Sequence, residues 1–523
     1  MGNPQFHRPD LALLSLEQQV AQMVVVRAAG YRFDHQIRYP NWEPPNKTLH
    51  EWIAHLGVGG IILVGGSAAE LRDRISSLQA LAEIPLLVGA DVEEGVGQRF
   101  SAATHFPPPM ALGAIAKQSP ETAIEYARKM GEMTAREALA LGINWLYAPV
   151  SDVNNNPNNP VINVRAFAET VETTSTLISA YIQGARVHPI LTTAKHFPGH
   201  GDTAVDSHLQ LPVLPHSPER LAEVELVPFQ HAIAAGVDAV MTAHLSIPAW
   251  DTEEPATLSA KILTEKLRQE LGFSGLIVTD ALVMGAIANH YGTNEAAVLA
   301  VQAGADILLM PGDPPGAIAA VCDAVREGKI TPERIQASVE RIWQAKEKIA
   351  APDIPQFPQA IGNIDTRETA RAITRDAQTV GGKLHLVPKP GYNLIAVDDA
   401  LDCAVLAKPA PAIILPEEEG YKLQLVDSHT PYPLPTWEEP TLLQLFVRGH
   451  PFRGSSQLND RAIALFQELV KTGHLQALVL YGSPYILDLL QPQLPADIPY
   501  VFSYGQMPDA QAIALQTLGF KST

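Results

Sequence analysis

Residues 189–208 of this 523-residue chain read PILTTAKHFPGHGDTAVDSH. The first six residues form a short, mostly apolar run that is typical of a buried strand. The next fourteen carry six charged or imidazole side chains, and one proline and two glycines interrupt them, which predicts an irregular loop. A polar loop that leaves the end of a buried strand is where α/β enzymes place their chemistry, so this stretch indicates an α/β enzyme.

Short apolar runs recur through the first two thirds of the chain. Helical patterns such as 120–141, 168–187 and 218–235 separate most of them. Alternating strands and helices predict a parallel sheet, and eight repeats favour a closed barrel over an open sheet. The eight runs are 22–26, 59–64, 85–90, 143–149, 190–194, 239–243, 276–279 and 307–310.

A second domain is predicted after the barrel. A helical pattern over 331–349 is followed by a proline-rich stretch at 351–358, which is typical of a semi-rigid linker. We therefore predict a TIM-type (β/α)8 barrel in residues 1–350, a linker over 351–365 and a smaller open α/β sandwich domain over 366–523. The elements predicted in this second domain are strands at 393–397, 412–415, 442–447, 477–481 and 500–503 and an amphipathic helix at 460–472.

The composition limits the partners of the protein. The net charge of -19 at pH 7 argues against nucleic acid or an anionic membrane and favours a neutral or cationic ligand. The two cysteines, Cys322 and Cys403, form neither a disulfide framework nor a zinc motif. The first residues contain no secretory apolar segment, and no apolar run has the length of a membrane span. We expect a cytoplasmic protein without membrane insertion.

The polar stretch also carries a family resemblance. Its pattern K-H-F-P-G-H-G-D-T-x-x-D-S-H, from Lys195 to His208, resembles the signature loop of the β-N-acetylglucosaminidase (NagZ-like) branch of glycoside hydrolase family 3. The resemblance extends over roughly residues 10 to 345. It implies a barrel fold and a catalytic dyad of Asp206 and His208, in which His208 is the general acid/base.

A lone acid, Asp280, ends the predicted strand in the segment GLIVTDAL (residues 275–282). An acid at the carboxyl end of a barrel strand points into the mouth of the barrel. The alternative is a structural aspartate that caps the next helix. The segment resembles the family motif G-x-x-x-T-D-x-L-x-M, and this resemblance implies that Asp280 is the catalytic nucleophile.

The predicted reaction follows from these groups. Glycoside hydrolysis requires one group to attack the anomeric carbon and another to protonate the leaving oxygen, and in retaining enzymes the two lie about 5 Å apart. Imidazole titrates near neutrality, so His208 can donate and recover a proton. Asp206 would orient the ring and stabilise its cation. We therefore expect a retaining double displacement that needs no cofactor and no metal.

Further positions resemble the sugar-binding residues of the family. Residues 91–100, DVEEGVGQRF, resemble D-x-E-G-G-R-V-Q-R-F and depart from it at positions 94, 96 and 97. The resemblance implies substrate contacts by Asp91 and Arg99, and the stretch NPVINVRAF (159–167) implies another by Arg165. Lys195 and His196 complete the set. The alternative role for both arginines is a structural ion pair with barrel carboxylates.

Two other histidines allow additional interpretations. His196 and His200 have the H-x-x-x-H spacing of a metal site, although Pro198 and Gly199 between them disfavour the helix that would bring both rings to one face. We therefore expect no metal here. His244 ends the predicted strand 239–243, and we expect it to be a supporting residue at the barrel mouth.

The leading hypothesis is an exo-acting β-N-acetylglucosaminidase that removes terminal GlcNAc from peptidoglycan-derived fragments. Its partner would be a small sugar substrate, either a GlcNAc-containing muropeptide or a chitooligosaccharide. Two alternative enzymes from the same family are a β-glucosidase or xylosidase, which a panel of aryl glycosides would reveal, and an N-acetylglucosaminide phosphorylase, which would form a sugar 1-phosphate. A non-catalytic sugar-binding module is a further alternative, but the candidate nucleophile and acid/base are both present.

Overall fold

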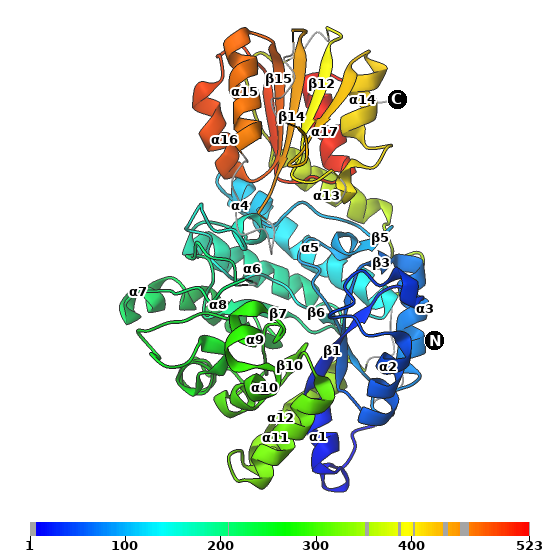
Figure 1. Cartoon of the computed structure of the whole chain (residues 1–523), viewed down its shortest axis with the longest axis vertical. Helices are drawn as coiled ribbons and strands as arrows, with labels where there is room; N and C mark the ends of the chain where they lie inside the picture. Colours follow the sequence, from blue (N-terminus) through cyan, green and yellow to red (C-terminus); the bar gives the residue numbers. More distant parts are fainter. Residues whose placement is uncertain are drawn as a thin grey trace.

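The structure of the chain is a computed structural model. It describes residues 7–207, 209–350, 355–384, 389–400, 403–431, 438–449 and 460–521. A barrel domain comes first, and a C-terminal α/β domain is stacked over it, with α4 and α13 in the region between them (Figure 1). In the part of the chain that the structure describes, no helix combines the length and apolar character needed to cross a membrane.

The first domain is a barrel of parallel strands, as predicted. Its strands form one sheet in the order β10-β1-β2-β4-β6 and another in the order β7-β8-β9. Isolated parallel bridges between Trp145 and Leu191 and between Val278 and Ile307 join the two sheets into a ring. Each of the eight predicted runs contributes one strand: β1 Val24–Ala29, β2 Gly60–Val64, β4 Leu87–Ala90, β6 Trp145–Leu146, β7 Thr193–Phe197, β8 Ala239–Thr242, β9 Leu276–Val278 and β10 Leu308–Leu309.

Helices connect these strands and surround the ring (Figure 1). A small two-stranded sheet of β3 (Gly66–Ser67) and β5 (Phe100–Ser101) lies beside them. The helices of this domain are α1 Leu16–Gln22, α2 Asn46–Glu51, η3 Trp52–Leu56, α3 Ala68–Gln79, α4 Met110–Ala116, α5 Pro120–Leu141, α6 Val171–Ala185, α7 Pro218–Glu223, α8 Leu226–Ala234, η7 Lys261–Glu270, α9 Gly285–Tyr291, α10 Thr293–Ala303, α11 Pro314–Arg326 and α12 Pro332–Ile349.

Local residue preferences explain where the best-predicted helix begins and ends. Helix α5 starts with Pro120, whose missing N–H is tolerated in a first turn, and it ends at Gly142, which has a φ of 96°. The prediction of a single helix over 218–235 was wrong, because the structure has α7 and α8 there. Pro228 lies in the first turn of α8, where a proline fits, so the helix restarts instead of continuing.

The signature stretch begins differently from the prediction. Strand β7 covers Thr193–Phe197, so Lys195 and His196 lie inside the strand and not in the loop that follows it. Both side chains are buried, with exposed fractions of 1% and 6%. Polarity made this segment look like a loop, but carboxylates around the barrel mouth compensate the charge of Lys195 and allow it to be buried.

The C-terminal domain is an open α/β domain, also as predicted. Its sheet has the order β11-β16-β15-β14-β12-β13, and only β11 is antiparallel to its neighbour. The elements are α13 Ile364–Asp376, β11 Thr379–Gly381, β12 Tyr392–Ala396, α14 Pro411–Glu418, β13 Lys422–Val426, β14 Thr441–Val447, α15 Asp460–Thr472, β15 Leu475–Gly482, α16 Pro484–Leu490, β16 Tyr500–Ser503 and α17 Pro508–Leu518.

One strand prediction in this domain was wrong. Residues 412–415 belong to helix α14, which begins with Pro411. A run of four apolar residues has no periodicity that separates a strand from a buried helical segment, and the proline before it fits a first helical turn. The proposed domain boundaries stay predictions. Part of the predicted linker, residues 351–354, lies outside the described residues.

Candidate active site

The predicted site residues gather at the carboxyl ends of the barrel strands. Asp91 directly follows β4, Lys195 and His196 lie in β7, and Asp280 follows β9 after one residue. Because all barrel strands are parallel, these ends lie on the same side of the barrel. That side is where enzymes with this fold place their active sites.

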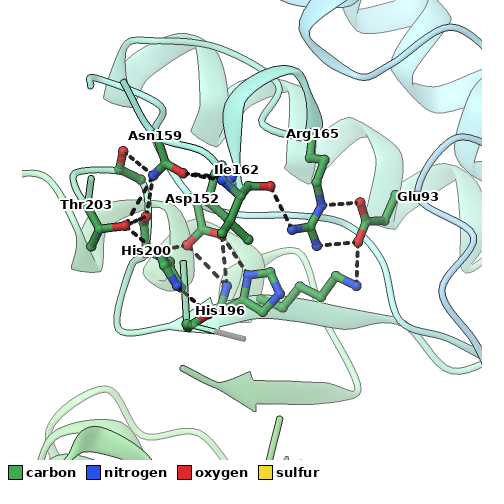
Figure 2. A network of polar contacts seen from close by, with 12 residues as sticks. Glu93, Asp152, Asn159, Ile162, Arg165, His196, His200 and Thr203 are labelled. Atoms are coloured by element: carbon green, nitrogen blue, oxygen red, sulfur yellow. Dashed lines mark hydrogen bonds and ion pairs between the residues drawn. The ribbon is translucent and has the colours of Figure 1, made fainter. Parts of the chain in front are cut away.

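Four residues at the barrel mouth, three of them predicted site residues, form a partly buried cluster of alternating charge. The Lys195 ammonium group lies 2.8 Å from Asp91 Oδ1 and 2.6 Å from Glu93 Oε1. The Arg165 guanidinium group donates two hydrogen bonds to the Glu93 carboxylate, with lengths of 2.9 and 2.8 Å, and a third to the Val161 carbonyl oxygen at 3.0 Å. Figure 2 shows Glu93 facing the Arg165 side chain. Two acids and two bases balance one another, which makes the burial of Glu93 and Lys195 tolerable.

Mutual attraction keeps Glu93 and Lys195 ionised. Burial alone would raise the pKa of Glu93, but the charges of Arg165 and Lys195 outweigh it and hold that pKa well below its ordinary value. Burial would lower the pKa of Lys195, but Asp91 and Glu93 raise it above its ordinary value. At neutral pH the site therefore presents fixed charged donors and acceptors, which suit the hydroxyl groups of a sugar.

Arg165 and Arg99 make structural contacts of their own. Arg165 forms a structural ion pair with the barrel carboxylate of Glu93, which is the alternative to substrate binding considered above. Three of its five N–H groups donate to Glu93 and to the Val161 carbonyl oxygen. Arg99 donates from Nε to the backbone oxygen of Asp91 at 3.0 Å. Arg165 thus lies beside Glu93 and Arg99 beside Asp91, while the contacts of both arginines with substrate stay predictions.

A second buried network centres on Asp152. His196 Nδ1 lies 2.8 Å from Asp152 Oδ2, and the His200 backbone N–H donates to Asp152 Oδ1 at 2.7 Å. The backbone N–H of His196 also donates to this carboxylate, at 3.2 Å. Figure 2 shows the carboxylate between the two histidines. Asp152 therefore fixes the ring of His196 and holds the chain on both sides of the turn at Pro198.

The same network anchors the loop that carries the predicted dyad. His200 Nδ1 lies 2.8 Å from Thr203 Oγ1, and His200 Nε2 lies 3.0 Å from Ser207 Oγ. The Asn159 side-chain amide donates to the carbonyl oxygens of His200 and Gly201 at 2.8 and 3.0 Å. Since both ring nitrogens of His200 are engaged in this way, its geometry supports anchoring of the loop and not the metal site considered for His196 and His200.

The predicted dyad is described only in part. Asp206 is buried, with an exposed fraction of 2%, and its neighbour Ser207 is held by His200. His208 lies outside the described residues. The structure thus describes one member of the dyad and the loop residues that precede the other, and the roles of both stay predictions.

Asp280 does not cap the helix that follows it. Helix α9 begins at Gly285, and its N-cap residue is Met284, without a capping side-chain hydrogen bond. The Asp280 carboxylate instead accepts from the Ala281 backbone N–H at 2.7 Å, and its own N–H donates to Thr242 Oγ1 at 3.3 Å. The structure thus removes the capping alternative and leaves a half-buried carboxylate at the barrel mouth.

His244 supports the segment that carries this carboxylate. Its Nδ1 lies 2.7 Å from Thr257 Oγ1 and its Nε2 lies 3.1 Å from the carbonyl oxygen of Ala281. The side chain is fully buried. This position beside the Asp280 segment matches the supporting role that its place at a strand end predicts.

Sequence reasoning missed Glu93 and Asp152. Glu93 is the third residue of the DVEEG stretch, and its fit to the family pattern D-x-E could have identified it. Asp152 follows the predicted strand 143–149 by three residues, so its place after a strand end was a usable signal. Their partners, Arg165, Lys195 and His196, are distant in the chain, and only the fold shows these contacts.

Replacing His200 with glutamine is expected to change how stability depends on pH. Burial lowers the pKa of His200 to about 4 from its ordinary 6.5, so the folded protein keeps the ring neutral while the unfolded chain binds a proton. The wild type should therefore lose up to about 3 kcal/mol of unfolding free energy through this residue as the pH falls from 6.5 to 4.

Urea unfolding of both proteins at pH 7, 5.5 and 4.5 measures this effect. The unfolding free energy of His200→Gln minus that of the wild type should become more positive as the pH falls. A difference that stays constant over this range would show that His200 is not held neutral in the folded protein.

Among the described residues, no group of three or more histidine, cysteine, aspartate or glutamate side chains is arranged to hold a metal ion.

Comparisons with known proteins place the chain in a family. Residues 15–345 match the model of the Glycosyl hydrolase family 3 N terminal domain, and residues 387–520 match that of the Bacterial Glycosyl hydrolase family 3 C-terminal domain. A glycoside hydrolase family 3 beta-N-acetylglucosaminidase from Paenibacillus sp. str. FPU-7 has a similar structure, with a TM-score of 0.80 and 30% sequence identity over 98% of each chain.

Two curated relatives support this placement. Beta-hexosaminidase A of Pseudoalteromonas piscicida is 35% identical over 337 residues, which cover 58% of this chain and 56% of the relative. Beta-N-acetylglucosaminidase/beta-glucosidase of Cellulomonas fimi is 31% identical over 381 residues, which cover 71% of this chain and 63% of the relative. The chain thus spans less than two thirds of the length of either relative. The matches over both domains confirm the predicted family, and the chain belongs to glycoside hydrolase family 3.

Proposed function

We propose that the protein is a retaining exo-β-N-acetylglucosaminidase. The observation that carries this proposal is the charged cluster of Asp91, Glu93, Arg165 and Lys195, which lies at the same end of the barrel as Asp280. The cluster offers directed donors and acceptors for one sugar ring, and Asp280 offers a nucleophile at the same end of the barrel. The similarity to a β-N-acetylglucosaminidase over 98% of both chains supports the choice of substrate class.

The proposed reaction proceeds in two displacements. In the first, an oxygen of Asp280 forms a bond to the anomeric carbon while the bond from that carbon to the leaving oxygen breaks, and His208 donates a proton to the leaving oxygen. In the second, His208 takes a proton from water, the water oxygen attacks the anomeric carbon, and Asp280 is released. Asp206 orients the imidazole and stabilises its cationic form. The product keeps the β configuration.

The described residues around this centre would hold the sugar. Lys195 and Arg165 can donate to hydroxyl oxygens, while Asp91 can accept from hydroxyl groups and has a side chain that is 28% exposed. His196, whose Nδ1 faces Asp152, is left with Nε2 for a ligand. Since these groups are locked by their mutual contacts before substrate arrives, little ordering is required on binding.

A panel of aryl glycosides is expected to show the preference for the acetamido sugar. The value of kcat/KM for an aryl N-acetyl-β-glucosaminide should exceed that for the matching β-glucoside and β-xyloside by about 100-fold or more, because a site built for a polar group rejects analogues that lack it. A higher kcat/KM for the glucoside or xyloside would contradict the proposal. If the protein is instead a phosphorylase, the same assay in phosphate buffer would produce a sugar 1-phosphate.

The biological substrate belongs to the same proposal. The family branch that the signature loop resembles implies release of GlcNAc from peptidoglycan fragments in the cytoplasm. Parallel digestion of a GlcNAc–anhydro-MurNAc muropeptide and of a chitooligosaccharide, with free GlcNAc as the measured product, separates the two candidate substrates. Cell fractionation with an antibody to the protein tests the location.

A further inference from the structure

The C-terminal domain meets the barrel at the loops that carry the sugar-binding cluster. Arg448 and Gly449 follow strand β14, and Tyr485 follows strand β15. The carboxyl ends of these parallel strands therefore face the barrel mouth. In open α/β sheets and in barrels alike, this is the edge that forms ligand sites.

The main contact is a buried ion pair between the domains. The Arg448 guanidinium group donates to both oxygens of Glu94, with Nη1 3.0 Å from Oε2 and Nη2 in close contact with Oε1. Glu94 is almost completely buried, with an exposed fraction of 1%, and His105 Nε2 lies 3.1 Å from its Oε2. A bidentate pair of this kind fixes the relative orientation of two chain segments as well as their distance.

This pair is one residue away from the sugar-binding cluster. Glu94 directly follows Glu93, which binds Arg165 and Lys195. A shift of Glu94 would therefore move the Glu93 backbone. The family pattern has glycine at position 94, which has no carboxylate, so the departure noted in the sequence provides the acid that Arg448 binds.

Two more contacts hold the loop on which Arg165 lies. A Cβ atom at Gly449 would lie 2.9 Å from the Pro160 carbonyl oxygen and 3.3 Å from Asn163 Cβ, so the two domains touch closely there. The Asn154 side-chain amide donates to the Tyr485 hydroxyl oxygen at 2.8 Å. Both loops of the cluster are thus held by the second domain.

We propose that the C-terminal domain contributes to substrate binding by holding two barrel loops in their binding geometry. Arg448 is the positioning residue for the loop that carries Glu93, and Gly449 and Tyr485 contact the loop that carries Arg165. This inference rests on the proposed function. It assigns a role in substrate affinity to a domain that lies outside the barrel and supplies none of the proposed catalytic groups.

Variants of the ion pair test this role in the full-length protein. Arg448→Gln and Glu94→Gln should each raise KM for an aryl N-acetyl-β-glucosaminide about tenfold and change kcat less than about threefold, because the nucleophile and acid/base stay in place. Arg448→Lys should raise KM less than Arg448→Gln, since lysine keeps the charge but not the two-point contact. The double variant should be no worse than either single variant, because both remove one shared interaction.

A matched control removes a different contact between the domains. The Tyr126 hydroxyl group, on α5, donates to Asp376 on α13 at 2.8 Å, away from the cluster. Tyr126→Phe should leave both kcat and KM within about twofold of the wild type.

Gly449→Ala keeps every charge and is the second test if an ion-pair variant fails to fold. Its methyl group should displace the Pro160–Asn163 turn and raise KM.

A wild-type protein that does not hydrolyse the acetamido substrate would overturn the proposed function and this inference with it. An active wild type whose folded Arg448→Gln and Glu94→Gln variants keep the same KM would overturn the inference alone. If those two variants do not fold, an unchanged KM in Gly449→Ala would do so.

Discussion

Replacing Asp280 with alanine is expected to lower kcat by about 10⁴-fold or more, because the reaction then lacks the group that attacks the anomeric carbon. Asp280 is half-buried at the end of β9, and the helix that follows begins without it, so the substitution removes no cap. Thermal unfolding should show a folded protein. Steady-state hydrolysis of an aryl N-acetyl-β-glucosaminide measures the loss.

A matched control comes from the next strand of the barrel. Asp313 follows β10 and accepts from the Gly316 backbone N–H at 3.2 Å, which makes it the N-cap of α11. Asp313→Asn should keep kcat within about twofold of the wild type and affect only stability. Azide or formate should restore part of the turnover of Asp280→Ala on an activated aryl substrate. A folded Asp280→Ala variant with nearly full activity would mean that the nucleophile is another residue.

Replacing His208 with alanine is expected to reduce kcat/KM by about 10² to 10⁴-fold on natural disaccharides and much less on aryl glycosides with acidic phenols. Natural aglycones are poor leaving groups and require a proton, whereas an acidic phenol leaves without one. Asp206→Ala should cause a smaller loss of the same kind, because the imidazole remains but is poorly oriented. Plots of kcat/KM against the pKa of the leaving group measure the effect.

His216 provides the control for this prediction. It pairs with Asp202 across the same loop region at 2.9 Å, so His216→Gln changes a histidine near the loop without removing the proposed acid/base. The effect of His216→Gln on kcat/KM should be the same for good and poor leaving groups. If His208→Ala slowed good and poor leaving groups equally, the role of His208 would be in binding, and the acid/base would be a different residue.

The barrel could be predicted from sequence because its strands are continuous apolar runs of the kind that parallel sheets bury on both faces. Helix α5 was predicted to the residue because proline and glycine mark its two ends. The prediction of a strand at residues 412–415 was wrong because a run of four apolar residues fits either a strand or a helix. Lys195 was placed in a loop because a charged residue inside a barrel strand is explained only by its acidic partners.

The candidate site also contains residues that the local sequence indicates and residues whose partners only the fold reveals. Asp91, Lys195 and Asp280 were found because they follow or end strands and match family patterns. Glu93 and Asp152 were missed because their partners are 102 and 44 residues away in the chain, at Lys195 and His196 respectively. The role of Arg448 was not predictable either, since it depends on how the second domain is stacked over the first.

We expect Asp280 to form a covalent bond with an acetamido sugar during turnover. The acetamido oxygen of such substrates offers a competing internal nucleophile, which would leave no sugar attached to the protein. Mass spectrometry of proteolytic peptides after incubation with a 5-fluoro-N-acetylglucosaminyl fluoride separates the two routes. We expect one sugar attached to the peptide that contains Asp280. An unlabelled protein that still turns over the reagent, or a label on another residue, would contradict it.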